Sequence, residues 1–475
     1  MSFGRGLTVI AVAGAAAVSM GFTANAHAQS NEQLLQMIQQ LSATVENLEG
    51  QVEAAKSTSE QAALAAADAS KKAQSGDAKW KWGPSPTIKS ADGKFEMHVR
   101  GRLMVDFGHV SDSEGFEDRN ATEFRRARLG IEGKAWKDVK YKFEIDFADN
   151  EVSITDAYLQ YKGWKNVALT VGQFKERVSL DEQTTSRQIL TQERAAFTDA
   201  FDFARRIGVG LDFKAGGFVL STGVYGGADL SANEDKEGYS IAARALYNFE
   251  LGNDKSVLHV GASFRHRDFG NDIDGNEFRY RQRPFAHVAG NRFVSTDTLD
   301  YIANDTFFGA ELAGTFGPFH ASAEYGLLKA SIENGMEAAY NGEGSATFQG
   351  GYIDFGWFLT GEHRPLDEGE WDRPKIKSPV FEGGWGAWRL LARVDYLDLN
   401  DFDAGIVGGR QISYIVGVDW YLNRHTRIMV NYAHTDVSKG LCPTGATCGY
   451  GDALVNPITG KNSIDAITAR FQVDW

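Results

Sequence analysis

The chain has 475 residues, a formal net charge of −14, and 52 glycines against only 9 prolines. This acidic balance excludes a general nucleic-acid binder, because such a protein needs a basic surface to neutralise phosphates. Hydrophobic residues make up a modest 43% and aromatic residues 12%, which favours strands that expose apolar side chains on one face only.

The first 28 residues have the pattern of a secretory signal peptide. Arg5 gives a positive start, an apolar stretch runs from Leu7 to Phe22, and a small-residue cleavage site, AHA, ends at Ala28. The stretch is too short for a spanning helix, and no other segment approaches the roughly 20 apolar residues that one needs. We therefore expect an exported protein, which could be periplasmic, secreted or a transmembrane barrel.

A helical pattern follows over residues 29–57. Apolar residues recur at alternating spacings of four and three, the seam of a coiled coil; they are Leu34, Ile38, Leu41, Val45, Leu48 and Val52. An amphipathic helix packed on a domain is the alternative. The residue types at the seam favour two strands, so the rest of the chain would have to impose a trimer. Residues 58–94 are expected to form an Ala- and Ser-rich linker, helical or loose, that leads into the next domain.

From residue 95 to Trp475 apolar and polar residues alternate in one segment after another. In the clearest case Tyr141, Phe143, Ile145 and Phe147 alternate with charged residues. One face of such a strand suits hydrocarbon and the other suits water, and short turns alternate here with long polar segments. The pattern predicts an all-β transmembrane barrel of about 16 antiparallel strands around an aqueous channel. Residues 361–384 are long for a short-turn position, so either that turn is unusual or a strand pair is missing from the count.

The last nine residues end this pattern on an aromatic residue. Ile467, Ala469, Phe471, Val473 and Trp475 occupy one face. In an outer-membrane barrel the terminal aromatic lies in the interfacial girdle, and the final strand pairs with the first to close the sheet. An ordinary edge strand of a soluble domain is the alternative.

One long loop, residues 176–204, is too apolar to extend into solvent. It carries Leu180, Ile189, Leu190, Phe197, Phe201 and Phe203. We expect it to fold into the lumen and set the width of the pore.

The inward faces of the predicted strands are charged, and the first two carry a dense group of arginines. Arginines in a narrow pore attract phosphate-like anions through bidentate hydrogen bonds. Alternatively, the arginines and carboxylates pair across strands and only solvate the wall. The candidate pore-lining residues are Arg100, Arg102, Arg125, Arg126, Arg128, Lys140, Lys142, Arg194, Arg206, Arg244 and Arg265.

Several motifs resemble, in order, those of the phosphate-selective porin O and P family. They are FRRARLG (124–130), YKFEIDF (141–147), DAY (156–158), VGQFK (171–175), FLTGEHR (358–364), YLDLND (396–401) and NYAHTD (431–436). The resemblance extends from about Trp82 to Trp475. It implies a trimeric outer-membrane barrel of sixteen strands, with the third loop folded inward and basic residues lining an anion path.

Carrying the family's positions over gives Arg102, Arg125, Arg126 and Arg194 as path residues. The alternation points Arg125 outward, so it would need a bulge or a strand end to reach the lumen. The predicted constriction residues are Asp181, Glu182, Arg187 and Glu193. Phosphate-selective members carry a lysine where this chain has the Asp-Glu pair, and an anion at the narrowest point repels a divalent anion. The resemblance therefore implies a porin, with weak phosphate selectivity.

Two cysteines, Cys442 and Cys448, lie in the last long loop, and in an exported protein such a close pair is expected to form a disulfide. No metal or cofactor site is predicted, and no hydrolase or phosphate-loop motif occurs.

We expect a non-enzymatic outer-membrane pore for small hydrophilic solutes, chiefly anions such as phosphate. The expected partners are outer-membrane lipid, lipopolysaccharide and two further copies of the chain, with the N-terminal segment in the periplasm. The alternatives are an envelope tether that contacts the cell wall through the N-terminal helix, and an outer-membrane hydrolase.

Overall fold

The computed structural model describes residues 31–73, 78–227, 238–252, 256–270, 278–440, 442 and 447–475. The chain divides into two units between residues 76 and 77, and each is described by itself. The predicted signal peptide lies outside the described residues.

The first unit contains the helix α1 (Asn31–Ala73). At 1.5 Å per residue its 43 residues extend about 65 Å. The helix continues past residue 57 to Ala73, so the first part of the predicted linker is helical, one of the two forms expected for it; its alanine-rich sequence has high helix propensity and contains no proline. On the predicted seam Val45, Leu48 and Val52 are 47%, 54% and 64% exposed. Among the described residues, no helix has both the length and the apolar character needed to cross a membrane.

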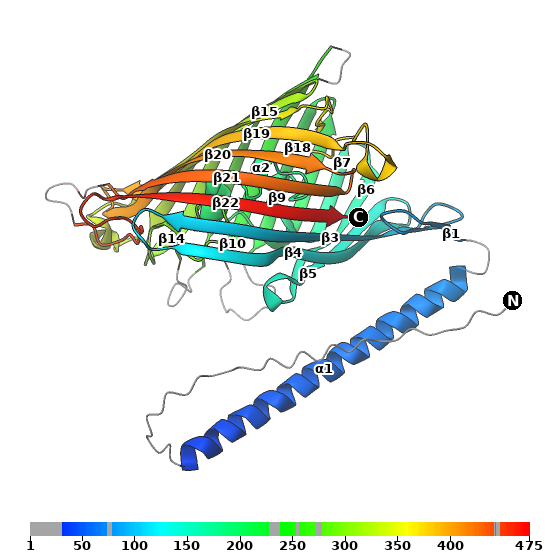
Figure 1. Cartoon of the computed structure of the whole chain (residues 1–475), viewed down its shortest axis with the longest axis horizontal. Helices are drawn as coiled ribbons and strands as arrows, with labels where there is room; N and C mark the ends of the chain where they lie inside the picture. Colours follow the sequence, from blue (N-terminus) through cyan, green and yellow to red (C-terminus); the bar gives the residue numbers. More distant parts are fainter. Residues whose placement is uncertain are drawn as a thin grey trace. The chain divides into compact units, whose positions relative to one another are not determined.

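The second unit is a closed antiparallel barrel, as the sequence predicts (Figure 1). Each strand pairs with the next, and the last pairs with the first. Among the described residues the wall has sixteen strands: β3 (Glu96–Asp112), β4 (Asp118–Ala135), β5 (Val139–Asp146), β6 (Ser153–Trp164), β7 (Val167–Lys175), β8 (Arg205–Ala215), β9 (Phe218–Gly226), β10 (Tyr239–Leu251), β11 (Ser256–Asp268), β14 (Ile302–Phe316), β15 (Phe319–Ile332), β16 (Ser345–Phe358), β19 (Ala387–Asp401), β20 (Ile406–Tyr421), β21 (Thr426–Ser438) and β22 (Lys461–Asp474).

Short elements lie before β3 and in the connections between the wall strands. A hairpin of β1 (Ala78–Lys81) and β2 (Thr87–Ser90) pairs with the start of β3, so part of the predicted linker belongs to the sheet. The other short elements are β12 (Arg281–Gln282) with β13 (Val294–Ser295), β17 (Leu366–Asp367) with β18 (Glu370–Trp371), α2 (Leu180–Gln183), α3 (Ala196–Ala200), and the 3₁₀ turns η1 (Ala148–Asn150), η2 (Glu337–Tyr340) and η3 (Val380–Glu382). In the last long loop Cys442 and Cys448 are joined by a disulfide, with their Cα atoms 6.1 Å apart.

The period-two alternation places apolar side chains outside and charged side chains inside. On β19, Trp388, Leu390 and Val394 are exposed whereas Arg389 and Arg393 are buried. This is the reverse of a soluble protein, whose core is apolar. It suits a wall with hydrocarbon on one side and an aqueous, charged lumen on the other.

The two ends of the barrel differ. The C-terminus, the β1–β2 hairpin and two-residue turns such as Gly216-Gly217 lie at one rim, which we call the terminal end. The longer loops lie at the other rim, the long-loop end. The exception is residues 359–386 between β16 and β19, which start from the terminal end. No strand pair is missing there, and the segment is one long turn whose Leu366 and Trp371 are buried.

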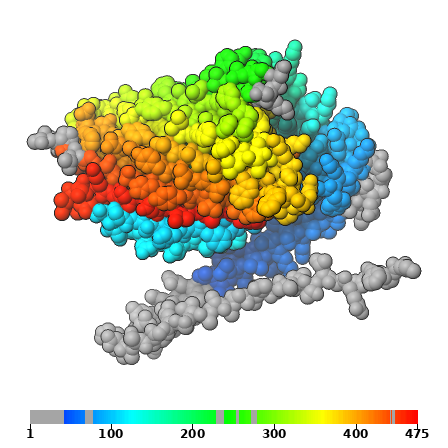
Figure 2. All heavy atoms as spheres, turned by 45° about the horizontal axis from the view of Figure 1, so that its top comes forward, coloured from blue at the N-terminus to red at the C-terminus, as the bar shows by residue number. Residues whose placement is uncertain are grey.

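Closure of the barrel centres on Trp475. Its backbone N–H donates to the carbonyl of Gly101 at 3.0 Å, and the N–H of Gly101 donates back at 3.1 Å. The indole covers Gly101, where an added Cβ would lie 2.2 Å from the ring. Figure 1 shows β22, in red, directly beside β3, in blue to cyan, and Figure 2 shows the red and cyan parts of the chain in contact. Closure leaves these wall strands without an unpaired edge.

Gly101→Val should prevent the seating of Trp475 and so destabilise the closed barrel, because the new side chain overlaps the indole. Gly344→Val is the matched control, since nothing lies within 4 Å of its added Cβ. Electrophoresis with and without heating separates folded from unfolded barrels. We expect Gly101→Val to lose the folded band while Gly344→Val retains it. A folded band of unchanged heat stability for Gly101→Val would contradict this role of Trp475.

Candidate functional site: the constriction of the lumen

The loop between β7 and β8, residues 176–204, lies inside the barrel and binds the opposite wall through its backbone. The N–H groups of Leu180 and Asp181 donate to the carboxylate of Glu324 on β15 at 2.9 and 2.7 Å. The N–H of Gln192 donates to Asn431 on β21 at 2.9 Å. These bonds fix the loop across the lumen, so it narrows the pore.

Aromatic packing holds the second half of this loop. Phe197, Phe201 and Phe203 gather around Phe307 of β14, with ring centroids 4.9 to 6.2 Å from the Phe307 ring. The six apolar residues that predicted inward folding are all buried, at 0 to 9% exposure. A loop anchored on both hydrogen bonds and packed aromatics is rigid enough to define a pore width.

Two cavities lie on either side of this loop. The long-loop cavity has a volume of about 280 Å³ and is bounded by loop residues 182–199 and 282–292. The terminal cavity, of about 470 Å³, is bounded by β3 to β9 and by residues 367–372. Arg205 lines both, and the consecutive Glu182 and Gln183 line one each. The two cavities therefore meet at Arg205 and at residues 182–183 of the loop, and this is where the constriction lies.

Four charged residues form the constriction cluster: Lys175, Glu182, Arg194 and Arg205. Glu182 lies between Lys175 Nζ at 3.4 Å and Arg194 Nε at 3.2 Å. Arg194 also donates to the carbonyls of Asp181 at 2.9 Å and Thr184 at 2.7 Å. Arg205 Nε contacts Asp156 at 3.1 Å. Glu182 is thus paired with two cations, and the cluster is not the anion-repelling site that the sequence suggested.

Asp181 does not face the pore. Its carboxylate accepts the N–H of Ala195 at 2.7 Å and contacts Arg393 on β19 at 3.2 Å. Burial would raise the pKa of the Asp181 carboxyl, but Arg393 and Arg194 hold it below its usual value. The prediction that Asp181 repels anions at the narrowest point is wrong, because the side chain is part of an ion pair against the wall.

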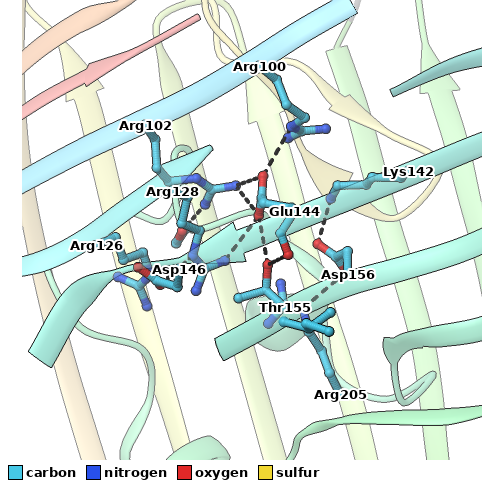
Figure 3. A network of polar contacts seen from close by, with 12 residues as sticks. Arg100, Arg102, Arg126, Arg128, Lys142, Glu144, Asp146, Thr155, Asp156 and Arg205 are labelled. Atoms are coloured by element: carbon cyan, nitrogen blue, oxygen red, sulfur yellow. Dashed lines mark hydrogen bonds and ion pairs between the residues drawn. The ribbon is translucent and has the colours of Figure 1, made fainter. Parts of the chain in front are cut away.

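The arginines of the first strands converge on one carboxylate (Figure 3). Glu144 on β5 contacts Arg100 at 3.1 Å, and Arg102 and Arg128 at 3.3 Å each. Arg128 also contacts Asp146 at 2.6 Å. Arg100 and Arg102 line the terminal cavity, whereas Arg128 lines neither cavity. Pairing across strands, the second sequence interpretation, therefore applies to all three arginines, and Arg100 and Arg102 also face the terminal cavity.

A β-bulge brings Arg125 and Arg126 together into the lumen. The register of β3 with β4 shifts there, because Met104 pairs with Arg126 and Val105 with Phe124. Arg125 is the extra residue, so the outward orientation that strict alternation predicted is wrong. Arg125 contacts Glu193 at 3.0 and 2.8 Å. Arg126, 6% exposed, donates to Met104 Sδ at 3.8 Å and has no carboxylate partner among the described residues.

Glu193 belongs to the same charged group. It contacts Arg125 and also Arg470 of β22 at 2.8 Å. Burial works to raise the pKa of the Glu193 carboxyl, but the two arginines hold it well below its usual value. Glu193 therefore stays ionised and neutralises part of the positive charge of the long-loop cavity.

The remaining predicted residues divide into two groups. Lys142, Arg187 and Arg244 line the terminal cavity, and Arg194 lines the long-loop cavity. Lys140 lines neither cavity and is exposed near the terminal end of β5. Arg206 and Arg265 also line neither, because both are buried with Glu176, at 3.3 and 3.5 Å. These three residues and Arg128 lie outside the two cavities, and their predicted place on the solute path stays a prediction.

Sequence reasoning missed cations that the structure places on the path: Lys162, Lys175, Arg177, Arg205, Lys214, Arg283 and Arg292. Lys175 and Arg205 are the last and first strand residues on either side of the inward loop. Their position at the base of that loop could have identified them as constriction residues.

Comparison with known proteins assigns the fold to a family. The family model for phosphate-selective porin O and P matches residues 97–475. The chain belongs to this family. The phosphate-selective porin resemblance is therefore confirmed, and the protein is an outer-membrane porin of a Gram-negative bacterium, which makes it a channel by family and fold.

Individual relatives cover most of this porin. An uncharacterized protein of Caulobacter vibrioides is 34% identical over 399 residues, covering 81% of this chain and 76% of the relative. Porin O of Pseudomonas aeruginosa is 27% identical over 400 residues, covering 74% of this chain and 85% of the relative. The solved structure of in-vitro folded OmpT of Vibrio cholerae is 12% identical, with a TM-score of 0.49, over 83% of this chain and 99% of that chain.

Glu182→Gln should raise the permeability of anions relative to cations about two- to threefold at low salt, because it frees Lys175 and Arg194 at the constriction. The reversal potential of single channels under a potassium chloride gradient measures this ratio. Glu343→Gln, at an exposed carboxylate of the loop between β15 and β16, is the control and should leave the ratio unchanged. An unaltered reversal potential in Glu182→Gln would remove Glu182 from the solute path.

Proposed function

We propose that this porin conducts small anions, inorganic phosphate among them, by passive diffusion through the two cavities. The supporting observation is a chain of basic residues that runs from the long-loop cavity through Arg205 into the terminal cavity. A basic lining lowers the entry barrier for anions and raises it for cations.

The long-loop cavity carries an excess of positive charge. Arg125, Arg126, Arg194, Arg205, Arg283 and Arg292 line it, against the carboxylates of Glu182, Glu193 and Asp199. Arg126 lines this cavity with no carboxylate partner among the described residues, and its buried Nε has no hydrogen-bond partner there. A guanidinium fork matches the oxygens of a phosphate in a bidentate geometry. This residue is therefore the best candidate for holding an entering anion.

Phosphate preference should be weak, because most cations on the path are already paired. Glu144, Asp156 and Glu182 form ion pairs with six of the cations that line the two cavities, namely Arg100, Arg102, Lys142, Arg205, Lys175 and Arg194. A paired cation attracts an anion less than a free one, so the pore discriminates chiefly through the residues that stay unpaired.

The unequal lengths of the strands around the wall favour a homotrimer. The strands β5 to β9 contain 8, 12, 9, 11 and 9 residues, whereas β3, β4 and β20 contain 17, 18 and 16. A nine-residue strand tilted by 45° rises only about 21 Å, less than the ~25 Å apolar band of a lipid-facing wall. The low side is better covered by neighbouring copies, and the tall side by lipid and lipopolysaccharide. In this arrangement the terminal end faces the periplasm and the long loops face outside.

The exposed seam of α1 supports a coiled coil between copies. Because Val45, Leu48 and Val52 are about half exposed or more, three helices of one trimer could bury them together. The envelope tether that the sequence suggested would use this coiled coil of α1 helices. We propose tethering only as a second function beside transport.

Phosphate added to one side should block chloride current by competing for the pore, and Arg126→Gln should raise the half-blocking concentration about fivefold, the effect of removing one unpaired charge in a water-like medium. Arg410→Gln, at an exposed arginine of β20, is the matched control. Purified protein that gives no conductance steps in a planar bilayer would contradict the channel itself. An unchanged blocking concentration in Arg126→Gln would contradict its role alone.

Leu48→Cys should form intermolecular disulfides under mild oxidation, because the position lies on the predicted seam. Asn47→Cys, one residue earlier and off the seam, should cross-link much less. Non-reducing electrophoresis of the purified porin measures both. Equal cross-linking of the two variants would argue against a coiled coil through this seam.

A further inference from the structure

The segment between β16 and β19 enters the lumen from the terminal end and meets the inward loop. Arg364 donates to the carbonyl of Gln188, and the N–H of Trp371 donates to Thr184 Oγ1 at 3.3 Å. From the wall, Arg244 Nη2 donates to the carbonyl of Gly369 at 2.7 Å. Leu366 and Trp371 pack with Leu180 of the inward loop in one apolar cluster. The hairpin β17–β18 is therefore held in a fixed place inside the barrel.

The sequence of this hairpin separates its two faces. Leu366, Gly369 and Trp371 are buried against the loop and the wall. The residues between and after them are Asp367, Glu368, Glu370 and Asp372; all four are exposed, and all four line the terminal cavity. The buried face thus fixes a row of carboxylates in the water through which a solute must leave.

The four carboxylates differ in whether a cation pairs with them. Glu368 forms an ion pair with Lys214. Asp367, Glu370 and Asp372 form no ion pair within 4 Å among the described residues, so the hairpin presents them unneutralised.

The cations of the terminal cavity, in contrast, are mostly neutralised. Lys142, Arg177 and Arg244 pair with Asp156, Asp212 and Glu311 at 2.6, 2.9 and 2.8 Å. Among the described lining residues Lys162 is the cation without such a carboxylate partner. In the terminal cavity the unpaired charges are therefore mainly carboxylates, whereas in the long-loop cavity they include the guanidinium of Arg126.

We propose that the hairpin 366–372 is a second selectivity element, which lowers anion permeability at the terminal outlet and admits cations there. This inference rests on the proposed channel function and concerns the same pore. A solute anion meets unpaired arginine first and unpaired carboxylates last. Because the two ends carry opposite unpaired charge, ionic current should also differ between the two polarities of an applied voltage. Salt screens such charges beyond about 10 Å at 0.1 M, so both effects are largest in dilute electrolyte.

The triple variant Asp367→Asn, Glu370→Gln, Asp372→Asn in the full chain tests this proposal. These changes keep side-chain size, so a hairpin that only supports the inward loop would leave selectivity unchanged. We expect the anion-to-cation permeability ratio, from reversal potentials in a dilute potassium chloride gradient, to rise about threefold, and the current asymmetry to diminish. Both shifts should be much smaller in 1 M salt. Glu382→Gln, at an exposed carboxylate of the same segment that lines neither cavity, should behave as wild type.

The possible outcomes separate the two proposals. Wild-type protein without conductance would overturn the channel function. A conducting triple variant with the wild-type reversal potential in dilute salt would overturn the role of the hairpin and leave the channel function intact. Should the triple variant not insert, Asp367→Asn, Glu370→Gln and Asp372→Asn made singly are each expected to shift the reversal potential in the same direction, and three unshifted single variants would equally overturn it.

Discussion

A strand in lipid has no water to satisfy its backbone N–H and C=O groups, and this constraint shapes the whole barrel. The sheet must close, which the mutual hydrogen bonds of Trp475 and Gly101 complete at the terminal rim. Sixteen strands enclose a lumen too wide for wall side chains alone to fill. The width of the pore therefore depends on segments that fold inward, among them residues 176–204 and 359–386.

Charged side chains that are buried inside the barrel need partners of opposite charge. The fully buried side chains include Arg265, Arg389 and Arg470, and each contacts a carboxylate, at 3.4 Å from Arg265 to Asp305 and 2.6 Å from Arg470 to Asp106. Truncating one member of such a pair leaves a buried charge unpaired, which typically costs about 3–5 kcal/mol. Most inward charges therefore form ion pairs that stabilise the wall. In the proposed channel, solute selectivity then depends on the few charges that remain unpaired, such as Arg126.

Alternation along the chain predicts the barrel, its closure and the inward face of each strand, because a period of two follows directly from strand geometry. It fails where geometry departs from the period. Arg125 turns inward at a β-bulge, and the types of the neighbouring residues do not predict where that bulge lies. Asp181 and Glu182 are adjacent yet face the wall and the pore respectively, since a short helical turn separates their directions. Whether an inward charge is paired depends on strands far apart in sequence, so the sequence could nominate Arg206 and Arg265 but could not exclude them.

The two inward segments start from opposite rims and bind each other, through Arg364 with Gln188 and Trp371 with Thr184. Neither position is therefore set by its own strands alone. The loop carries the constriction and the hairpin carries the outlet carboxylates, so a change in one displaces charges of the other. A pore built in this way can change its selectivity by substitution in a turn that lies outside the narrowest point, while the hydrogen-bonded wall remains the same.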